Sequence, residues 1–242
     1  YVTTSLCSPS LATIFTGLHT HQHGITSNDP PTPKGIARAE RQKAMREIRP
    51  KLIAKIDPHP SLVGLLAKNG YLTLQTGKWW LGNPKDRGFT HTMTQGGDNP
   101  RARHGDEGLA IGRDTMQPIK DFVDEAVRDK KPFFVWYAPF LPHTPHNPPE
   151  RLLAKYRDRA PSLSEATYYA MVDWLDETCG QMFDYIEKKG ADKDTIVAYV
   201  ADNGWFPNPA KVGTNVRSKL TPYDAGLRTP ILLSWPGKIA AK

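Results

Sequence analysis

The chain has 242 residues, of which 38% are hydrophobic, and a formal net charge of +7. This length can bury one sizeable core and is ordinary for a single α/β domain. No stretch approaches the roughly 18 apolar residues that a membrane helix needs, and two cysteines cannot build a disulfide framework. The positive charge suits an anionic ligand such as nucleic acid or a sulfated polymer. Because no RNA-binding, zinc-finger or helix-turn-helix pattern is present, we expect neither a nucleic-acid partner nor a membrane span.

The first predicted element is a short helix with a cysteine at its start. Ser8 is a preferred N-cap residue, Pro9 suits the first helical position, and Gly17 can end the helix in the left-handed conformation. Apolar residues at helical spacing predict one buried face; they are Leu11, Ile14 and Phe15. The unpaired N–H groups and the positive end of the helix dipole would face Cys7 and attract an anion. A buried cysteine before an ordinary helix is the alternative.

Basic residues are concentrated between positions 38 and 55. They are Arg38, Arg41, Lys43, Arg46, Arg49, Lys51 and Lys55, against Glu40 and Glu47. We interpret this stretch as a solvated helix face or a mobile insertion, and a binding site for a polyanion is the less favoured alternative.

Strands and helices alternate along the rest of the chain. Strands are predicted at 71–75, 133–138, 195–201 and 231–235, helices at 61–69, 116–128 and 164–189, and a loop at 83–116. The unbroken apolar run at 133–138 predicts a central parallel strand covered on both faces, and the two later strands are also expected to be buried. This alternation predicts a layered α/β fold.

Candidate chemical residues follow the predicted strands. Lys78 comes after the first strand, His143 and His146 lie in a proline-rich loop after the second, and Asp202-Asn203 ends the third. Sites in open α/β sheets form beyond the carboxyl ends of strands. The Asp202 carboxylate and the Asn203 amide oxygen are ligand types that calcium or magnesium prefers, although Asp-Asn-Gly alone is also a common turn.

These segments resemble, in the same order, the motifs of the type I sulfatases, members of the alkaline phosphatase superfamily in which the cysteine of Cys-x-Pro-Ser-Arg becomes formylglycine. The matching segments are Cys7-Ser8-Pro9-Ser10 with Thr16-Gly17, Gly77-Lys78-Trp79-Trp80-Leu81-Gly82, Pro142-His143-Thr144-Pro145, Asp202-Asn203-Gly204, and Lys219 before Tyr223-Asp224-Ala225-Gly226-Leu227-Arg228-Thr229-Pro230. The resemblance implies an alkaline-phosphatase-like α/β/α fold with a mostly parallel central sheet. It also implies that residues 1–242 form a partial sulfatase catalytic domain, without the family's N-terminal Asp-Asp strand and C-terminal domain.

The resemblance further implies a sulfuric ester hydrolase that uses formylglycine made from Cys7. Calcium, with magnesium as the alternative, would be bound by Asp202, Asn203 and the modified Cys7. Lys78 and Lys219 would neutralise the sulfate oxygens. The implied partners are a sulfated small molecule or glycan and a formylglycine-generating enzyme. The implied compartment is periplasmic or extracellular, with no signal region in this chain.

The two histidines of the proline-rich loop have separate implied roles. His143 would protonate the leaving alcohol, because the ordinary pKa of histidine suits proton transfer near neutrality. His146 is a candidate for substrate contact.

Two positions depart from the family pattern. Leu11 replaces the arginine that supports formylglycine in relatives, and Trp80 replaces a histidine that acts on the nucleophile. Both changes concern the nucleophile, whereas the residues expected to bind sulfate are retained. A phosphoester or phosphonate hydrolase of the same superfamily and a non-catalytic binder of sulfated ligands are therefore kept as alternatives.

Overall fold

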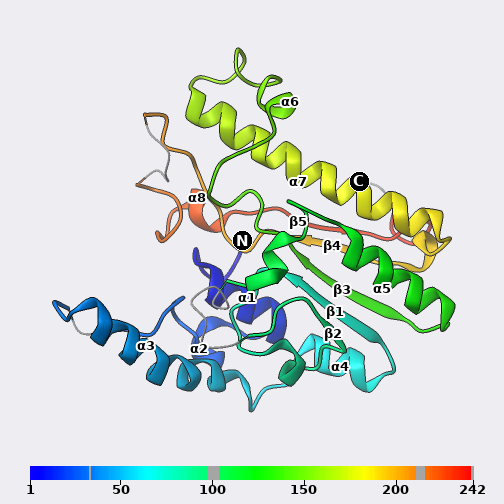
Figure 1. Cartoon of the computed structure of the whole chain (residues 1–242), viewed down its shortest axis with the longest axis horizontal. Coiled ribbons are helices and arrows are strands. Elements are labelled where there is room, and N and C mark those ends of the chain that lie inside the picture. Colours follow the sequence, from blue (N-terminus) through cyan, green and yellow to red (C-terminus); the bar gives the residue numbers. More distant parts are fainter. Residues whose placement is uncertain (33, 97–103, 211–215, 241–242) are drawn as a thin grey trace.

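The computed structural model describes residues 1–32, 34–96, 104–210 and 216–240, and Figure 1 shows how their elements are arranged. The helices are α1 (Cys7–Thr16), α2 (Thr20–His23), α3 (Arg38–Ile53), α4 (Leu62–Lys68), α5 (Gln117–Arg128), α6 (Glu150–Leu153), α7 (Leu163–Lys188) and α8 (Asp224–Leu227). The strands are β1 (Leu72–Gly77), β2 (His91–Thr92), β3 (Phe133–Ala138), β4 (Val197–Val200) and β5 (Ile231–Ser234). Short 3₁₀ segments are η1 (Ala54–Ile56), η2 (Pro84–Arg87), η3 (Asp106–Ala110) and η4 (Asp192–Asp194).

The described strands form a parallel sheet and a separate antiparallel pair. The sheet has the order β2-β1-β3, and β1 pairs with β3 from Leu72 opposite Phe133 to Gly77 opposite Ala138. β4 pairs with β5 in antiparallel fashion. Parallel pairing was predicted, but β3 lies at an edge of this sheet rather than at its centre. The prediction of a loop at 83–116 is also wrong in part, because β2 and two 3₁₀ segments lie there.

Both faces of the parallel sheet are covered, as the apolar run of β3 predicts. Successive side chains of a strand point to opposite faces, and those of β3 join two different hydrophobic clusters. Phe133, Val135 and Tyr137 belong to the cluster of α5 and α7, whereas Phe134, Trp136 and Ala138 belong to the cluster of α1 and α4. The two helix layers lie on opposite sides of the strands in Figure 1. The chain therefore has the alkaline-phosphatase-like α/β/α architecture.

The predicted burial of the last two strands is wrong. All four residues of β5 are exposed, with Leu232 at 61% and Leu233 at 62% exposure, and β4 is at most half-buried. An apolar run predicts a strand, but its burial depends on which elements pack over it.

The helix boundaries also correct two details of the prediction, because Ser8 is not the N-cap and Pro9 is the third helical residue rather than the first. α1 begins at Cys7 and its N-cap is Leu6, so Ser8 is not the cap; instead the Ser8 N–H donates to Asn28 Oδ1 at 2.8 Å. Gly17 ends the helix with φ 72°, as predicted. No helix in the described part of the chain combines the length and apolar character needed to cross a membrane.

Candidate active site

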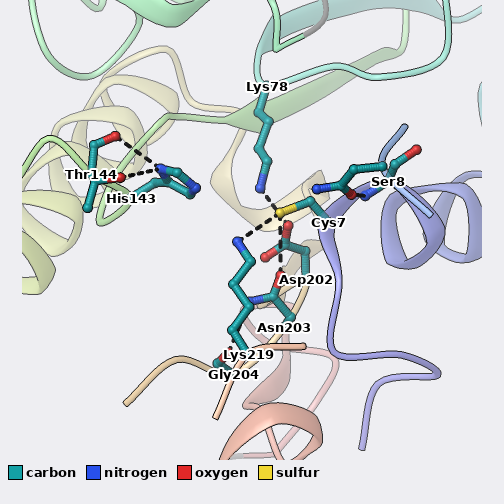
Figure 2. Close-up of polar contacts among 10 residues, drawn as sticks. Cys7, Ser8, Lys78, His143, Thr144, Asp202, Asn203, Gly204 and Lys219 are labelled. Atoms are coloured by element: carbon teal, nitrogen blue, oxygen red, sulfur yellow. Dashed lines mark hydrogen bonds and ion pairs between the residues drawn. The ribbon is translucent and has the colours of Figure 1, made fainter. Parts of the chain in front are cut away.

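Five polar side chains meet at the start of α1 (Figure 2). Cys7 is 1% exposed; its Sγ accepts from Lys219 Nζ at 3.1 Å and donates to Asn203 Oδ1 at 3.5 Å. Lys78 Nζ forms an ion pair with Asp202 Oδ2 at 2.7 Å. The structure therefore brings together the predicted cysteine, both lysines and the Asp-Asn pair from distant parts of the sequence.

Lys78 is positioned by a tight turn at the end of β1. Gly77 has φ 72°, and a Cβ there would lie 1.9 Å from the carbonyl oxygen of Ala138. Only glycine fits this backbone conformation and this close approach. The Lys78 N–H then donates to Ala138 O at 2.6 Å. The turn directs Lys78, which is 8% exposed, toward Asp202.

The Asp-Asn-Gly turn after β4 packs directly on α8. The Gly204 N–H donates to Gly226 O at 2.9 Å, and a Cβ on Gly204 would lie 2.2 Å from Ala225 O. A larger residue at 204 would push this turn away from α8. The glycine therefore sets how far Asp202 and Asn203 reach toward Cys7.

Lys219 is held by the segment that precedes α1. Its neighbour Leu220 donates its N–H to Ser5 O at 3.0 Å and has φ 68°, a left-handed conformation that costs energy for leucine. On the other side, Ser218 is fully buried and its Oγ accepts from the Phe206 N–H. Lys219 thus reaches Cys7 because residues 5 and 220 are tied together.

Mutual charge keeps the Lys78–Asp202 pair ionised. Burial alone would lower the pKa of Lys78, but the Asp202 charge, with a smaller effect of Cys7, raises it above its ordinary value. Burial alone would raise the pKa of Asp202, but the charge and hydrogen bond of Lys78 hold it below its usual range. The site therefore keeps one carboxylate and at least one ammonium group near neutral pH.

His143 faces this cluster from the loop after β3 (Figure 2). Its Nδ1 lies 3.0 Å from Thr144 O, and because a carbonyl oxygen only accepts, Nδ1 carries the proton of the neutral ring. Burial lowers the pKa of His143 to about 4, with further lowering by Lys219 and Lys78. The ordinary histidine pKa assumed from the sequence is therefore not the value found at this position.

Arg113 organises the histidine loop, and no sequence pattern identified it. Its Nη2 donates to the carbonyl oxygens of Phe140, His143 and Pro145 at 3.3, 3.0 and 3.2 Å. Its Nη1 donates to Asn147 Oδ1 at 2.7 Å. One guanidinium thus fixes four points of the loop that carries His143.

His146 does not join the Cys7 cluster in the described contacts. Its ring instead packs edge-on against Trp205 at a centroid distance of 5.1 Å and lies 5.9 Å from Tyr168. Burial lowers the pKa of His146. Its predicted role in substrate contact remains a prediction.

The two departures from the family pattern are apolar and buried. Leu11 is 5% exposed and Trp80 is 2% exposed, and both belong to the hydrophobic cluster that also contains Cys7. The Trp80 ring lies 4.6 Å from that of His104 and 5.6 Å from the guanidinium carbon of Arg49. Neither departure adds a charged group beside Cys7.

Asp202 and Asn203 offer the type of ligand atom that the predicted metal site needs, but not enough of them. The oxygens of Asp202 and Asn203 are hard ligands, but a calcium ion takes about 6–8 oxygens. Within the described residues, no group of three or more histidine, cysteine, aspartate or glutamate side chains is placed to hold an ion. These two side chains can supply only part of a metal shell.

The fold and the site define an alkaline-phosphatase-like α/β/α protein in which a buried cysteine, two lysines and an Asp-Asn pair meet at the strand ends. The chain belongs to the sulfatase family, because the family model described as Sulfatase matches residues 1–242. Mouse N-acetylgalactosamine-6-sulfatase is 25% identical over 278 residues, which cover 100% of this chain and 50% of that protein. This chain thus spans about half the length of the curated relatives it matches.

Solved structures support the fold. The crystal structure of Ps i-CgsB has a TM-score of 0.72 and 23% identity, covering 99% of this chain and 57% of that one. A second crystal structure of Ps i-CgsB, in complex with k-i-k-neocarrahexaose, has a TM-score of 0.69 and 23% identity, covering 98% of this chain and 57% of that chain.

Proposed function

We propose that the protein is a sulfuric ester hydrolase that cleaves a sulfate ester. One observation carries the proposal: two lysines and the N-terminal end of α1 converge on a buried Cys7 in a chain of the sulfatase family. Ammonium groups and backbone N–H groups in a buried site stabilise the negative charge of a transferring group. Lys219 and Lys78 are assigned to the sulfate oxygens.

Cys7 is proposed to be converted to formylglycine by a formylglycine-generating enzyme. Formylglycine at this position would provide a hydrate hydroxyl as the nucleophile toward the sulfur, with the alcohol of the ester as the leaving group. The position of Cys7 in the first turn of α1 suits an anion, because the positive end of the helix dipole lies there. Lys219 Nζ lies 3.1 Å from Cys7 Sγ and places a second positive charge beside it.

His143 is assigned to the proton of the leaving alcohol. With Nδ1–H bound to Thr144 O, its Nε2 is the nitrogen available for proton exchange. Its pKa of about 4 reflects burial and two nearby lysines. An anionic sulfate ester between the lysines would offset their charge and raise this pKa, so that Nε2 binds a proton before the ester breaks.

Asp202 and Asn203 are proposed to bind a calcium ion, or a magnesium ion, together with the modified Cys7. The metal would neutralise charge on the sulfate group. Because the two side chains offer too few oxygens by themselves, no catalytic step is assigned to the ion here.

The substrate is proposed to be a sulfated small molecule or glycan, and residues 1–242 are proposed to form part of the catalytic domain. The complex of Ps i-CgsB with an oligosaccharide supports the glycan alternative. A periplasmic or extracellular location is proposed from the sulfatase family.

A non-catalytic binder of sulfated ligands is the second candidate. The observation that favours it is the burial of Leu11 and Trp80 in the apolar cluster, since both occupy positions where the family pattern has polar residues. Such a protein would keep the lysines and bind sulfate without turnover.

The test is to express the full chain with a formylglycine-generating enzyme and to analyse the tryptic peptide ending at Lys34 by mass spectrometry. Conversion of Cys7 together with hydrolysis of an aryl sulfate is the expected result, with Cys7→Ala as the inactive control. Unmodified cysteine with sulfate binding but no hydrolysis would favour the binder. Hydrolysis of an aryl phosphate but not of the sulfate would favour the phosphoester alternative.

A further inference from the structure

Helix α3 is the most exposed long element of the chain. Its 16 residues include no buried one, and Figure 1 shows its first half projecting away from the body of the molecule. It carries six basic and two acidic side chains, a net charge of +4. Because no residue of α3 is buried, packing does not dictate its composition. The arrangement of its charges therefore needs another explanation.

The basic residues of α3 are sorted by type between its two sides. At about 100° per residue, four arginines fall within about 140° of the helix circumference. They are Arg38, Arg41, Arg46 and Arg49, which we call the arginine stripe. The opposite side carries Glu40, Lys43, Glu47 and Lys51.

Within the helix, the lysine side is charge-balanced and the arginine stripe is not; Arg49 forms an ion pair with Asp29 of another segment at 3.9 Å. Glu40 and Lys43 are three residues apart, and Glu47 lies four residues from both Lys43 and Lys51, spacings that stabilise a helix. The stripe has no acidic residue three or four positions from any arginine, and its members repeat at the spacing where like charges repel. A helix that was merely solvated would gain from acidic residues there.

The outer three arginines have no anionic partner in the described part of the chain. The structure records no ion pair or side-chain hydrogen bond for Arg38, Arg41 or Arg46. Glu40 instead accepts a hydrogen bond from the backbone N–H of Ala37. These guanidinium groups are exposed on one side of the helix and available to a ligand.

The stripe ends beside the segment that follows Lys78. Its last member, Arg49, lies over the Trp80 ring at 5.6 Å and donates from Nη2 to Trp80 O at 3.3 Å. Trp80 is two residues after Lys78, which lies in the Cys7 cluster. Eleven residues separate Arg38 from Arg49, so the stripe extends about 16 Å outward from this contact.

We infer that the arginine stripe binds a polysulfated carbohydrate chain and directs one of its sulfate groups to Cys7. The inference rests on the proposed function for that sulfate. Guanidinium groups bind oxyanions through two parallel hydrogen bonds, and a row of them suits a polymer with repeated sulfates. Single-stranded nucleic acid also has repeated anions, but its binding uses aromatic stacking on bases, and α3 has no aromatic residue.

The test compares two double variants of the full chain that change the same charge on the same helix. Arg38→Gln with Arg41→Gln removes half of the stripe, and Lys43→Gln with Lys51→Gln is the matched control. The measurements are the Kd for a heparin octasaccharide, the Kd for a single-stranded DNA of equal charge, and aryl sulfate hydrolysis. We expect the stripe variant to weaken heparin binding about tenfold, and the control to weaken it less than about twofold. DNA should bind more weakly than heparin, with no preference for the stripe.

The outcomes separate this inference from the proposed function. Equal losses of heparin binding in both variants, or no loss in either, would overturn the inference, and circular dichroism would verify that α3 still folds. Tighter, stripe-dependent binding of DNA would overturn it in favour of a nucleic-acid surface. Aryl sulfate hydrolysis should be unchanged in both variants. If the protein without substitutions, with Cys7 converted to formylglycine, hydrolyses no aryl sulfate while stripe-dependent heparin binding persists, the proposed hydrolysis fails and the binding surface stands.

Discussion

The two lysines at Cys7 have the same charge but are held in different ways. Lys78 follows β1, is 8% exposed and is paired with Asp202 at 2.7 Å. Lys219 is half-buried in a segment without regular structure and contacts Cys7 Sγ at 3.1 Å. Lys78 is thus a residue of the site and also contributes to the stability of the fold through its ion pair. Lys219 owes its place to the contact between residues 5 and 220.

Because of this difference, substitutions of the two lysines should affect stability and activity to different extents. Removal of a buried cation leaves its carboxylate unpaired, whereas removal of a cation that contacts only the reacting group leaves the fold intact. We therefore expect variants of the two lysines to share a loss of activity and to differ in stability.

The largest expected effect is that of Lys78→Met. It should reduce hydrolysis about 10²–10³-fold and lower the free energy of unfolding by about 3 kcal/mol, because Asp202 loses its buried partner. Urea denaturation measures the second effect. Adding Asp202→Asn should restore most of the stability but none of the activity. A double variant as unstable as Lys78→Met would show that the ion pair is not the cause.

Lys219→Met should reduce hydrolysis by a similar factor of about 10²–10³. Its free energy of unfolding should stay within about 0.5 kcal/mol of the original protein. Steady-state kinetics and urea denaturation on the same preparation give both numbers. A stability loss equal to that of Lys78→Met would mean that the two lysines are held alike.

A smaller effect is expected at Arg113, which acts on the site through the His143 loop. Arg113→Lys keeps the charge but loses the fork that binds three carbonyl oxygens. We expect kcat/KM to fall about tenfold and the free energy of unfolding to fall by about 1–2 kcal/mol. The matched control is Arg128→Lys, at a side chain that is 70% exposed. Similar losses in both variants would argue against a positioning role.

At neutral pH the smallest effect is that of His143, whose contribution to stability changes only under acidic conditions. Its folded pKa of about 4 lies below the ordinary 6.5, so between these values the unfolded chain binds a proton that the folded chain does not. Its contribution is complete above about pH 6.5 and is lost as the pH falls toward 4, by at most about 1.4 kcal/mol per pH unit. Denaturation in EDTA should show that His143→Gln removes this part of the acid destabilisation. An identical pH profile in the variant would contradict the lowered pKa.

A double variant that lacks both lysines should sharpen the comparison of Lys78 and Lys219. Lys219 contacts Cys7 Sγ at 3.1 Å, and Cys7 contributes to the raised pKa of Lys78. Because both lysines act on Cys7, the fold losses of activity of the single variants should not multiply in the double variant. Non-additive kinetics are expected when residues act on one group. Additive losses would place the two lysines on different groups of the substrate.

Much of the site follows from short segments of the sequence. The glycine that ends β1 and the glycine of Asp-Asn-Gly lie where no larger residue fits, and periodicity and turn signals predicted both beyond strands. Lys78 and Asp202 were therefore expected at strand ends. The arginine stripe likewise follows from the spacing of arginines in residues 38–49. The contact of Arg49 with Trp80 does not follow from the sequence.

Other features needed the folded chain. Arg113 lies in a stretch without periodicity. Its role in holding the His143 loop depends on the loop carbonyl oxygens that the fold places around it. The N-cap of α1 is Leu6 and not Ser8, and the Ser8 N–H is bound by the remote side chain of Asn28. β5 reads as a buried strand and is exposed, since burial is decided by what packs over a strand.

The sequence by itself determined the sulfatase motifs, their order, the alternation of strands and helices, and the charge of α3. Those properties depend on backbone sterics and on side-chain spacing within a few residues. Only the tertiary structure decided that Lys219 reaches Cys7 across 212 positions, that Lys78 pairs with Asp202, and that the His143 pKa falls to about 4. Distances and desolvation between remote segments arise from packing, and packing is a property of the whole fold.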